Sequence, residues 1–257
     1  MLNQNMDTRS VTFNIIAINV LVFVACYFYP ALSNYLSLHY FFNKHDYLNL
    51  LYSGSIDSTM FPNLSAFAEQ ASAYGERGGF LPMQIFTHMF MHANISHIFF
   101  NMFGLYMIGN ILERVWGPKR YLLFYVLTGF GAVLLHVAVQ AFLVYQATGS
   151  INPSMALLEN NTDAWGTYFS TTVGASGALF GVLTGFAVLF PNTELYIMFI
   201  PIPVKAKYFV SVYILIELYS GFAMSGGDNV AHFAHLGGAL FGFLLVKYWN
   251  KNGNSLF

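Results

Sequence analysis

Three segments of this sequence carry polar side chains that could take part in catalysis. Ser176 lies in a Gly-Ala-Ser-Gly motif, His232 and His235 share an Ala-His-Phe-Ala-His-Leu-Gly-Gly motif, and His97 precedes Asn101 by four residues. A serine hydroxyl becomes a strong nucleophile when a neighbouring base takes its proton, and a neutral imidazole suits that role near neutral pH. Asparagine and histidine can donate hydrogen bonds to the negative charge that such an attack creates.

The composition indicates that these side chains lie in a membrane protein. Of the 257 residues, 56% are hydrophobic and only 8% are charged, whereas soluble proteins carry about 25% charged residues. The net charge of −1 gives no reason to expect a nucleic-acid partner. The single cysteine, Cys26, cannot form an internal disulfide. The first apolar run begins near Val11 and lacks a signal-peptide pattern, so we expect it to remain in the membrane.

Six segments have the length and apolar character of membrane spans, since a helix needs about 20 apolar residues to cross the hydrocarbon core. We therefore expect an all-α polytopic membrane protein built as a six-transmembrane-helix bundle. The predicted spans are 12–31, 92–114, 120–146, 171–191, 207–225 and 229–249.

The basic residues predict the orientation of these spans. Eight of the ten lysines and arginines fall on one side of a six-span arrangement, and only Lys44 and Arg77 fall on the other. Because basic residues favour the cytoplasmic side, we expect a cytoplasmic N-terminus over 1–11, a transmembrane domain over 12–249 and a cytoplasmic C-terminus over 250–257. The long connection 32–83 is then external.

The second, fourth and sixth spans would begin at the external face, and each carries one of the polar groups about five or six residues inside. At 1.5 Å per residue, His97, Ser176 and His235 would lie at a similar depth, about 8 Å below the outer boundary. We expect His235 to be the base. The side chains of His97 and Asn101, together with the Ser176 backbone N–H, would stabilise the oxyanion.

Glycine spacing favours His235 over His232. Gly177 begins a series of glycines at four-residue spacing, and Gly238 and Gly242 follow His235 by three and seven residues. Small residues at this spacing let two helices approach closely in lipid. These glycines could serve helix packing alone. However, His235 lies on the same helix face as Gly238 and Gly242, so it would point at the helix that carries Ser176.

No carboxylate on the helix of His235 lies within reach of its ring, because Asp228 is seven residues away. We therefore predict a Ser–His dyad rather than a triad. Phe180, one turn after Ser176, would pack against the His235 ring and hold its orientation.

These motifs, taken together, resemble the rhomboid family. The resemblance implies a six-helix rhomboid core and an intramembrane serine endopeptidase that cleaves transmembrane proteins near the outer face of the bilayer. It implies that the reaction needs no metal and no organic cofactor. It also implies that membrane lipids surround the protein and that the protein lies in a bacterial inner membrane. Many rhomboids have a Trp-Arg pair where this chain has Met83 and Gln84. The resemblance rests on 86–92 with His97 and Asn101, Gly109 with Glu113, Trp116 with Gly117, Gly174 to Gly177, and 234–238 with Gly242.

Two other functions are compatible with parts of this pattern. A catalytically inactive rhomboid-like binding or chaperone protein would share the fold, although the full set of catalytic residue types argues against it. A metalloprotease or metal transporter would use the histidines as ligands, but no His-Glu-x-x-His motif occurs and no carboxylate is expected at the depth of the site. The histidines concerned are His88, His92, His97, His232 and His235.

Overall fold

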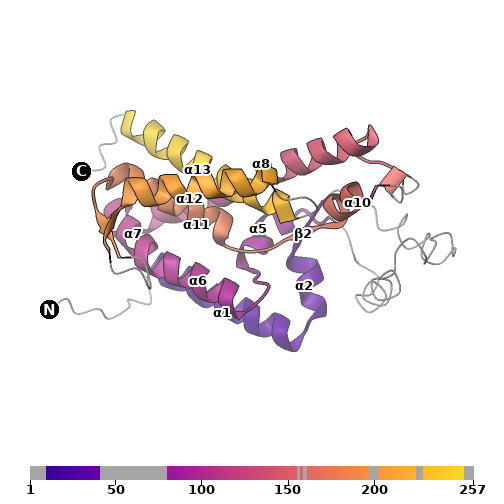
Figure 1. The fold of residues 1–257 in the computed structure, drawn as a ribbon. Helices are drawn as coiled ribbons and strands as arrows, with labels where there is room; N and C mark the ends of the chain where they lie inside the picture. Colours follow the sequence, from indigo (N-terminus) through magenta and orange to yellow (C-terminus); the bar gives the residue numbers. More distant parts are fainter. Residues whose placement is uncertain are drawn as a thin grey trace.

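The computed structural model describes residues 10–40, 80–154, 157–158, 161–196, 202–223 and 228–251, and these form a bundle of helices (Figure 1). Two pairs of two-residue strands join segments between helices. In chain order the elements are α1 (Val11–Phe28), α2 (Ala31–Leu36), β1 (Leu38–His39), α5 (Gln84–Thr87), the 3₁₀ helix η1 (His88–Phe90), α6 (Ile95–Gly104), the π-helix η2 (Leu105–Gly109), α7 (Asn110–Trp116), α8 (Pro118–Thr148), α10 (Thr162–Phe169), β2 (Thr171–Thr172), α11 (Ser176–Leu189), β3 (Glu194–Leu195), β4 (Val204–Lys205), α12 (Ala206–Ala223) and α13 (Asp228–Lys251).

A helix occupies each of the six ranges predicted as spans, but not all six meet the length and hydropathy of a membrane span. Three stretches of described residues do so: α1, α8 and the continuous helix Ile95–Trp116 formed by α6, η2 and α7. The apolar α11 has only 14 residues, or about 21 Å of helix. The prediction of a helical membrane protein is therefore confirmed, and the count of six spans stays a prediction.

Local sequence explains where the long helices begin and end. The Ser10 hydroxyl accepts a hydrogen bond from the Phe13 amide at the start of α1, and Pro30 follows its end, where proline disfavours helix in the residue before it. Gly117 and Gly149 bracket α8 with φ angles of 76° and 75°. Glycine adopts such angles without strain, so the chain can turn sharply at both ends of this helix.

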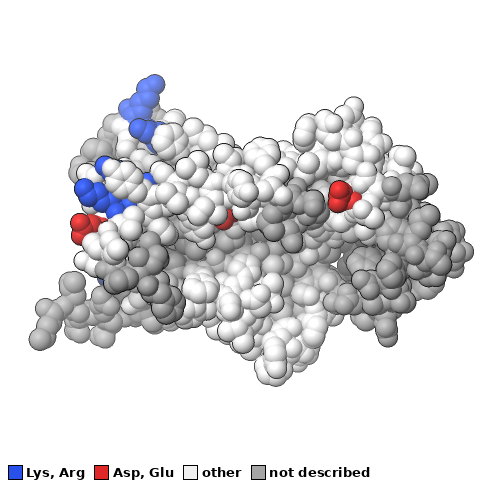
Figure 2. All heavy atoms as spheres, in the orientation of Figure 1, with Lys and Arg blue, Asp and Glu red and all other residues white. Residues whose placement is uncertain are grey.

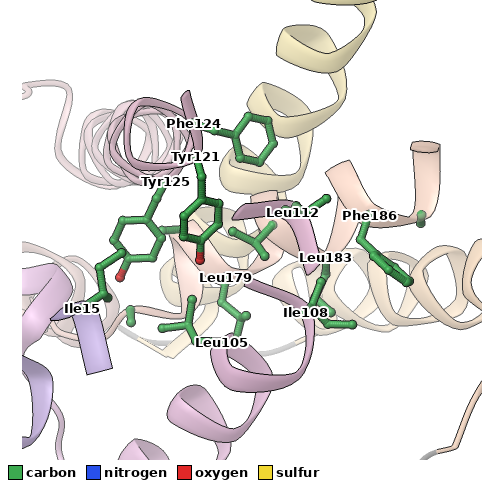
Figure 3. Close-up of a cluster of buried hydrophobic side chains, with 14 of the residues drawn as sticks. Ile15, Leu105, Ile108, Leu112, Tyr121, Phe124, Tyr125, Leu179, Leu183 and Phe186 are labelled. Carbon is green, nitrogen blue, oxygen red and sulfur yellow. The ribbon is translucent and has the colours of Figure 1, made fainter. Parts of the chain in front are cut away.

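The centre of the bundle is formed by α8, α11, α12 and α13, which pack on one another, while α1 packs against α6, η2 and α7. The largest hydrophobic cluster joins α1, the helix through η2 and α7, α8 and α11 (Figure 3). Its labelled side chains in Figure 3 are Ile15, Leu105, Ile108, Leu112, Tyr121, Phe124, Tyr125, Leu179, Leu183 and Phe186.

A carboxylate fastens the start of α1 to α7. Glu113 accepts hydrogen bonds from the Val11 amide at 2.7 Å, from the Ser10 hydroxyl at 2.8 Å, and from the amide and hydroxyl of Thr12 at 2.9 and 2.7 Å. The first amides of a helix have no carbonyl partner within it. Glu113 therefore caps α1 from a residue about one hundred positions later in the chain.

The basic side chains visible in Figure 2 gather at one end of the molecule, the end at which α13 finishes (Figures 1 and 2). The described lysines and arginines all lie at or near helix ends: Arg114, Lys119, Arg120, Lys205, Lys207, Lys247 and Lys251. Basic residues favour the cytoplasmic side of a membrane, and the orientation expected from the sequence stays a prediction.

Most of the predicted external connection 32–83, including 41–79, lies outside the described residues. Its described ends are joined to the bundle. Gln84, which is fully buried, accepts hydrogen bonds from the amides of His39 and Leu81 and donates one to the Asn34 carbonyl. Gln84 thus ties the segment after α1 to the segment before α6.

Candidate active site

Ser176 is the first residue of α11, and the segment before it enters the bundle in extended form. β2 pairs antiparallel with β1, with Leu38 opposite Thr172. The Gly174 amide then donates to the carbonyl of His88 at 2.9 Å. Gly174 has a φ of 128°, an angle that residues other than glycine rarely adopt. The chain thus reverses from strand to helix directly before the serine.

His235 contacts Ser176 from the neighbouring helix. Its Nε2 lies 2.8 Å from the Ser176 Oγ, a hydrogen-bonding distance. The two residues come from α13 and α11, which pack side by side. The structure therefore contains the hydroxyl–imidazole contact that the sequence predicted.

The predicted positions of these residues along their helices are wrong, whereas their depth below the membrane boundary stays a prediction. Ser176 is the first residue of α11, His97 the third of α6 and His235 the eighth of α13, instead of five or six residues inside each. Residues 171–175, which the sequence predicts as the start of the fourth span, form the strand β2 and a non-helical turn. As a result the first amides of α11, including that of Ser176, have no carbonyl partner within their helix.

Glycines allow α11 and α13 to approach at backbone contact. A Cβ added to Gly238 would overlap the carbonyl oxygen of Gly177, and one added to Gly242 would lie 2.6 Å from the carbonyl oxygen of Gly181. Only helices with small residues at the contact can come so close. This contact holds the serine and histidine helices together.

The Phe180 ring lies flat against the His235 ring. Their centroids are 4.4 Å apart and the planes differ by 6°. Phe180 is itself buried, with 4% of its surface exposed. The packing contact predicted between these two side chains is present, and it limits rotation of the imidazole.

The expectation that no carboxylate reaches His235 is wrong. The Oε2 atom of Glu217, in the middle of α12, lies 2.8 Å from the His235 Nδ1. Asp228 is the acidic residue on the helix of His235 itself, whereas Glu217 lies on the adjacent helix α12. The available signal was a single acidic residue inside an otherwise apolar span, which usually marks a functional site.

The same carboxylate oxygen contacts His232, whose Nδ1 lies 2.7 Å away. Glu217, His232 and His235 form a group of metal-ligand type, with ligand atoms within 4.8 Å of one another, so the expectation of no carboxylate near these histidines is also wrong. Hydrogen bonds at 2.7 and 2.8 Å already account for this group without an ion. His88 and His92 belong to other contacts: His88 Nδ1 lies 2.8 Å from the carbonyl of Gln84.

The His97 ring and the Ser176 hydroxyl both lie close to Gly174. A Cβ built on Gly174 would lie 2.9 Å from His97 Nε2 and 3.4 Å from Ser176 Oγ. Glycine leaves this position open between the hydroxyl and the imidazole. A site about 3 Å from both a nucleophile and a hydrogen-bond donor is where a reacting carbonyl group can bind.

Asn101 is buried, with 5% of its surface exposed, and is linked to His97 through His92. Its Nδ2 lies 3.0 Å from His92 Nε2, and the His92 ring packs edge-on against the His97 ring with centroids 4.9 Å apart. The start of α6 is fixed in turn by Asn94, whose side chain accepts from the His97 amide. His92 is a further member of the site, which the sequence suggested only as a metal ligand.

Comparisons with known proteins identify the family that this chain resembles. The family described as "Rhomboid domain" matches residues 81–251, which include all the site residues above. Rhomboid protease AarA of Providencia stuartii is 30% identical over 173 residues, covering 61% of this chain and 52% of its own length. RHOMBOID-like protein 1 of Arabidopsis thaliana is 31% identical over 182 residues, covering 66% and 38%. Rhomboid protease GluP of Bacillus subtilis is 29% identical over 189 residues, covering 72% and 29%. This chain therefore spans about half the length of AarA and less of the other two.

Proposed function

The chain belongs to the rhomboid family of integral membrane proteins, and we propose that it is a serine endopeptidase that cleaves transmembrane segments of other proteins near the outer face of the bilayer. The observation that carries the proposal is the 2.8 Å contact between Ser176 Oγ and His235 Nε2. A hydroxyl with an imidazole acceptor at this distance, and a third group orienting the imidazole, is the arrangement of an activated nucleophile.

In the first step, Ser176 Oγ attacks the carbonyl carbon of the scissile peptide bond while its proton passes to His235 Nε2. The resulting imidazolium then donates this proton to the leaving nitrogen, and the C–N bond breaks. His235 next accepts a proton from water, which attacks the acyl-enzyme ester. Return of the proton to Ser176 Oγ releases the carboxylic acid and restores the site.

The negative oxygen of the tetrahedral intermediate needs hydrogen-bond donors. The Ser176 amide lies at the N-terminus of α11, where the helix dipole also favours negative charge. The His97 imidazole flanks the position above Gly174, and Asn101 is held beside it through His92. We assign these three groups to the oxyanion site. No step of this chemistry uses a metal or an organic cofactor.

The placement of basic residues supports a cytoplasmic location for both termini. The likeness to rhomboid proteases of two bacteria supports a bacterial inner membrane. α11 runs from Ser176 toward the end of the molecule that carries the basic residues. The catalytic groups would then lie in the outer half of the bilayer. An intact substrate helix hides its carbonyl groups in hydrogen bonds, so the preferred substrates are transmembrane segments that unwind easily.

The direct test is labelling of the detergent-solubilised protein with a serine-reactive fluorophosphonate, together with cleavage of a fluorogenic transmembrane peptide. Wild-type protein should be labelled at Ser176, and both Ser176→Ala and His235→Ala should lose cleavage by at least about 10³-fold. Chelators should leave cleavage unchanged. A Ser176→Ala variant that cleaves at the wild-type rate would disprove the proposal.

The inactive alternative makes a different prediction for the same experiment. A rhomboid-like binding or chaperone protein would bind transmembrane helices equally well with or without the Ser176 hydroxyl, and it would cleave none of them. Substrates that differ by one helix-breaking residue near the cleavage site provide a second control, since the residue should raise cleavage only if the substrate helix must unwind.

A further inference from the structure

Glu217 is an acidic side chain in the middle of an apolar helix, with 7% of its side chain exposed. Burying a carboxylate away from water is costly unless hydrogen-bond donors surround it. Among the described residues, the Nδ1 atoms of His232 and His235, both on α13, lie 2.7 and 2.8 Å from its Oε2 atom. The carboxylate therefore contacts the imidazole that we assign as the base, on the ring nitrogen opposite Ser176.

The protonation of the two rings follows from this contact. An ionised carboxylate can only accept hydrogen bonds, so the Nδ1 atoms of both histidines must carry their protons. In a neutral imidazole only one nitrogen is protonated. His235 Nε2 is then left with a free lone pair, and it faces the Ser176 hydroxyl at 2.8 Å. Glu217 thus selects the tautomer of His235 that can accept the serine proton.

The carboxylate also acts on the charged form of the ring. When His235 takes up the serine proton, its positive charge lies beside the Glu217 oxygen at 2.8 Å. This attraction stabilises the imidazolium in the transition state and contributes little while the ring is neutral, which is the condition for accelerating a chemical step.

From this geometry we propose that Glu217 is a positioning residue for His235, so that the catalytic group is a Ser176–His235–Glu217 triad rather than a dyad. His232 completes it by donating a second hydrogen bond to the same carboxylate oxygen, which fixes the orientation of Glu217. This inference rests on the proposed protease function but makes separate predictions.

The decisive variant is Glu217→Gln, which keeps the shape of the side chain and removes its charge. We expect kcat for a transmembrane peptide to fall by about 100-fold or more, while KM changes by less than about threefold, because the lost interaction forms mainly in the transition state. The rate of fluorophosphonate labelling at Ser176 should fall in parallel. His232→Ala should lower kcat by only about 10-fold, since His235 keeps its own contact with the carboxylate.

Controls separate this role from a structural one. Glu194→Gln makes the same chemical change at an exposed residue of β3 and should leave kcat unchanged. The thermal unfolding temperature of Glu217→Gln should stay within a few degrees of wild type. In a His235→Ala background, adding Glu217→Gln should change the residual labelling rate by less than about twofold, because Glu217 acts through the missing ring.

The results of these experiments distinguish a catalytic triad from a structural role of Glu217, from a metal site and from a failure of the protease function. Wild-type kcat in Glu217→Gln, with Ser176→Ala and His235→Ala inactive, would overturn the triad and leave the protease function intact. A further loss in the His235→Ala background would assign Glu217 a purely structural role. Loss of wild-type activity on chelation, restored by Zn²⁺, would make the cluster a metal site and overturn the proposal. If Ser176→Ala itself retained activity, the protease function would fail instead.

Discussion

The contact between α11 and α13 predicts that one added methyl group should uncouple the serine from the histidine. In Gly242→Ala the new Cβ would lie 2.6 Å from the carbonyl oxygen of Gly181, whereas ordinary contacts begin at 3.4 Å. The helices must therefore separate by about 0.8 Å. A parallel shift of this size would stretch the 2.8 Å contact between Ser176 and His235 to about 3.6 Å, beyond the range of a hydrogen bond.

We expect Gly242→Ala to lower kcat by about 100-fold, since misplacement of reacting groups by about 1 Å has effects of that order. Overpacking should also destabilise the fold by about 1–3 kcal/mol, which a thermal unfolding curve in detergent would detect. Fluorophosphonate labelling at Ser176 should slow in parallel with peptide cleavage, because both depend on the base and not on substrate binding.

Gly104→Ala is the matched control, because its added methyl would meet only the flexible end of the Leu179 side chain, at 3.0 Å. It should keep at least half of the wild-type kcat. Gly238→Ala should be more damaging than Gly242→Ala, because its methyl would overlap the Gly177 carbonyl oxygen. A Gly242→Ala variant with wild-type labelling, cleavage and unfolding temperature would refute the close contact of the two helices.

Three further variants test other parts of the site and fold. Asn101→Ala should lower kcat by about 10²-fold through loss of oxyanion stabilisation, with KM nearly unchanged in the peptide assay; an unchanged kcat would remove Asn101 from the oxyanion site. Phe180→Leu should lower kcat by about 10-fold, because an aliphatic side chain restrains the His235 ring less, and a wild-type labelling rate would contradict this. Glu113→Ala should destabilise the fold by about 3 kcal/mol or more, since it leaves the donors at the start of α1 without their acceptor; equal unfolding temperatures of variant and wild type would show that the anchor is dispensable.

The sequence predicted the site best at polar residues within apolar stretches, because a polar side chain is costly in a membrane unless it has a function. Ser176 and His235 lie in apolar stretches with glycines at helical spacing, and this pattern was sufficient to predict their contact. The Phe180 stacking followed from the same helical geometry, because residues one turn apart share a face.

Two features could not be predicted from periodicity. The segment 171–175 is apolar enough to continue a helix, and its extended form depends on pairing with β1 and on the hydrogen bond from Gly174 to the His88 carbonyl. Both partners lie far away in the sequence. Glu217 was missed because its register against α13 depends on the packing of two helices, which the spacing within one helix does not reveal.

The anchor between α1 and Glu113 also has a consequence for biosynthesis. The matched family domain begins at residue 81, after α1, yet the cap of α1 comes from Glu113 inside that domain. At about 5–20 residues per second, the ribosome needs on the order of 5–20 s to make the intervening chain. Until Glu113 has been synthesised, the first amides of α1 lack this acceptor. The hydrogen bonds between α1 and Glu113 can therefore form only after the second predicted span has been made.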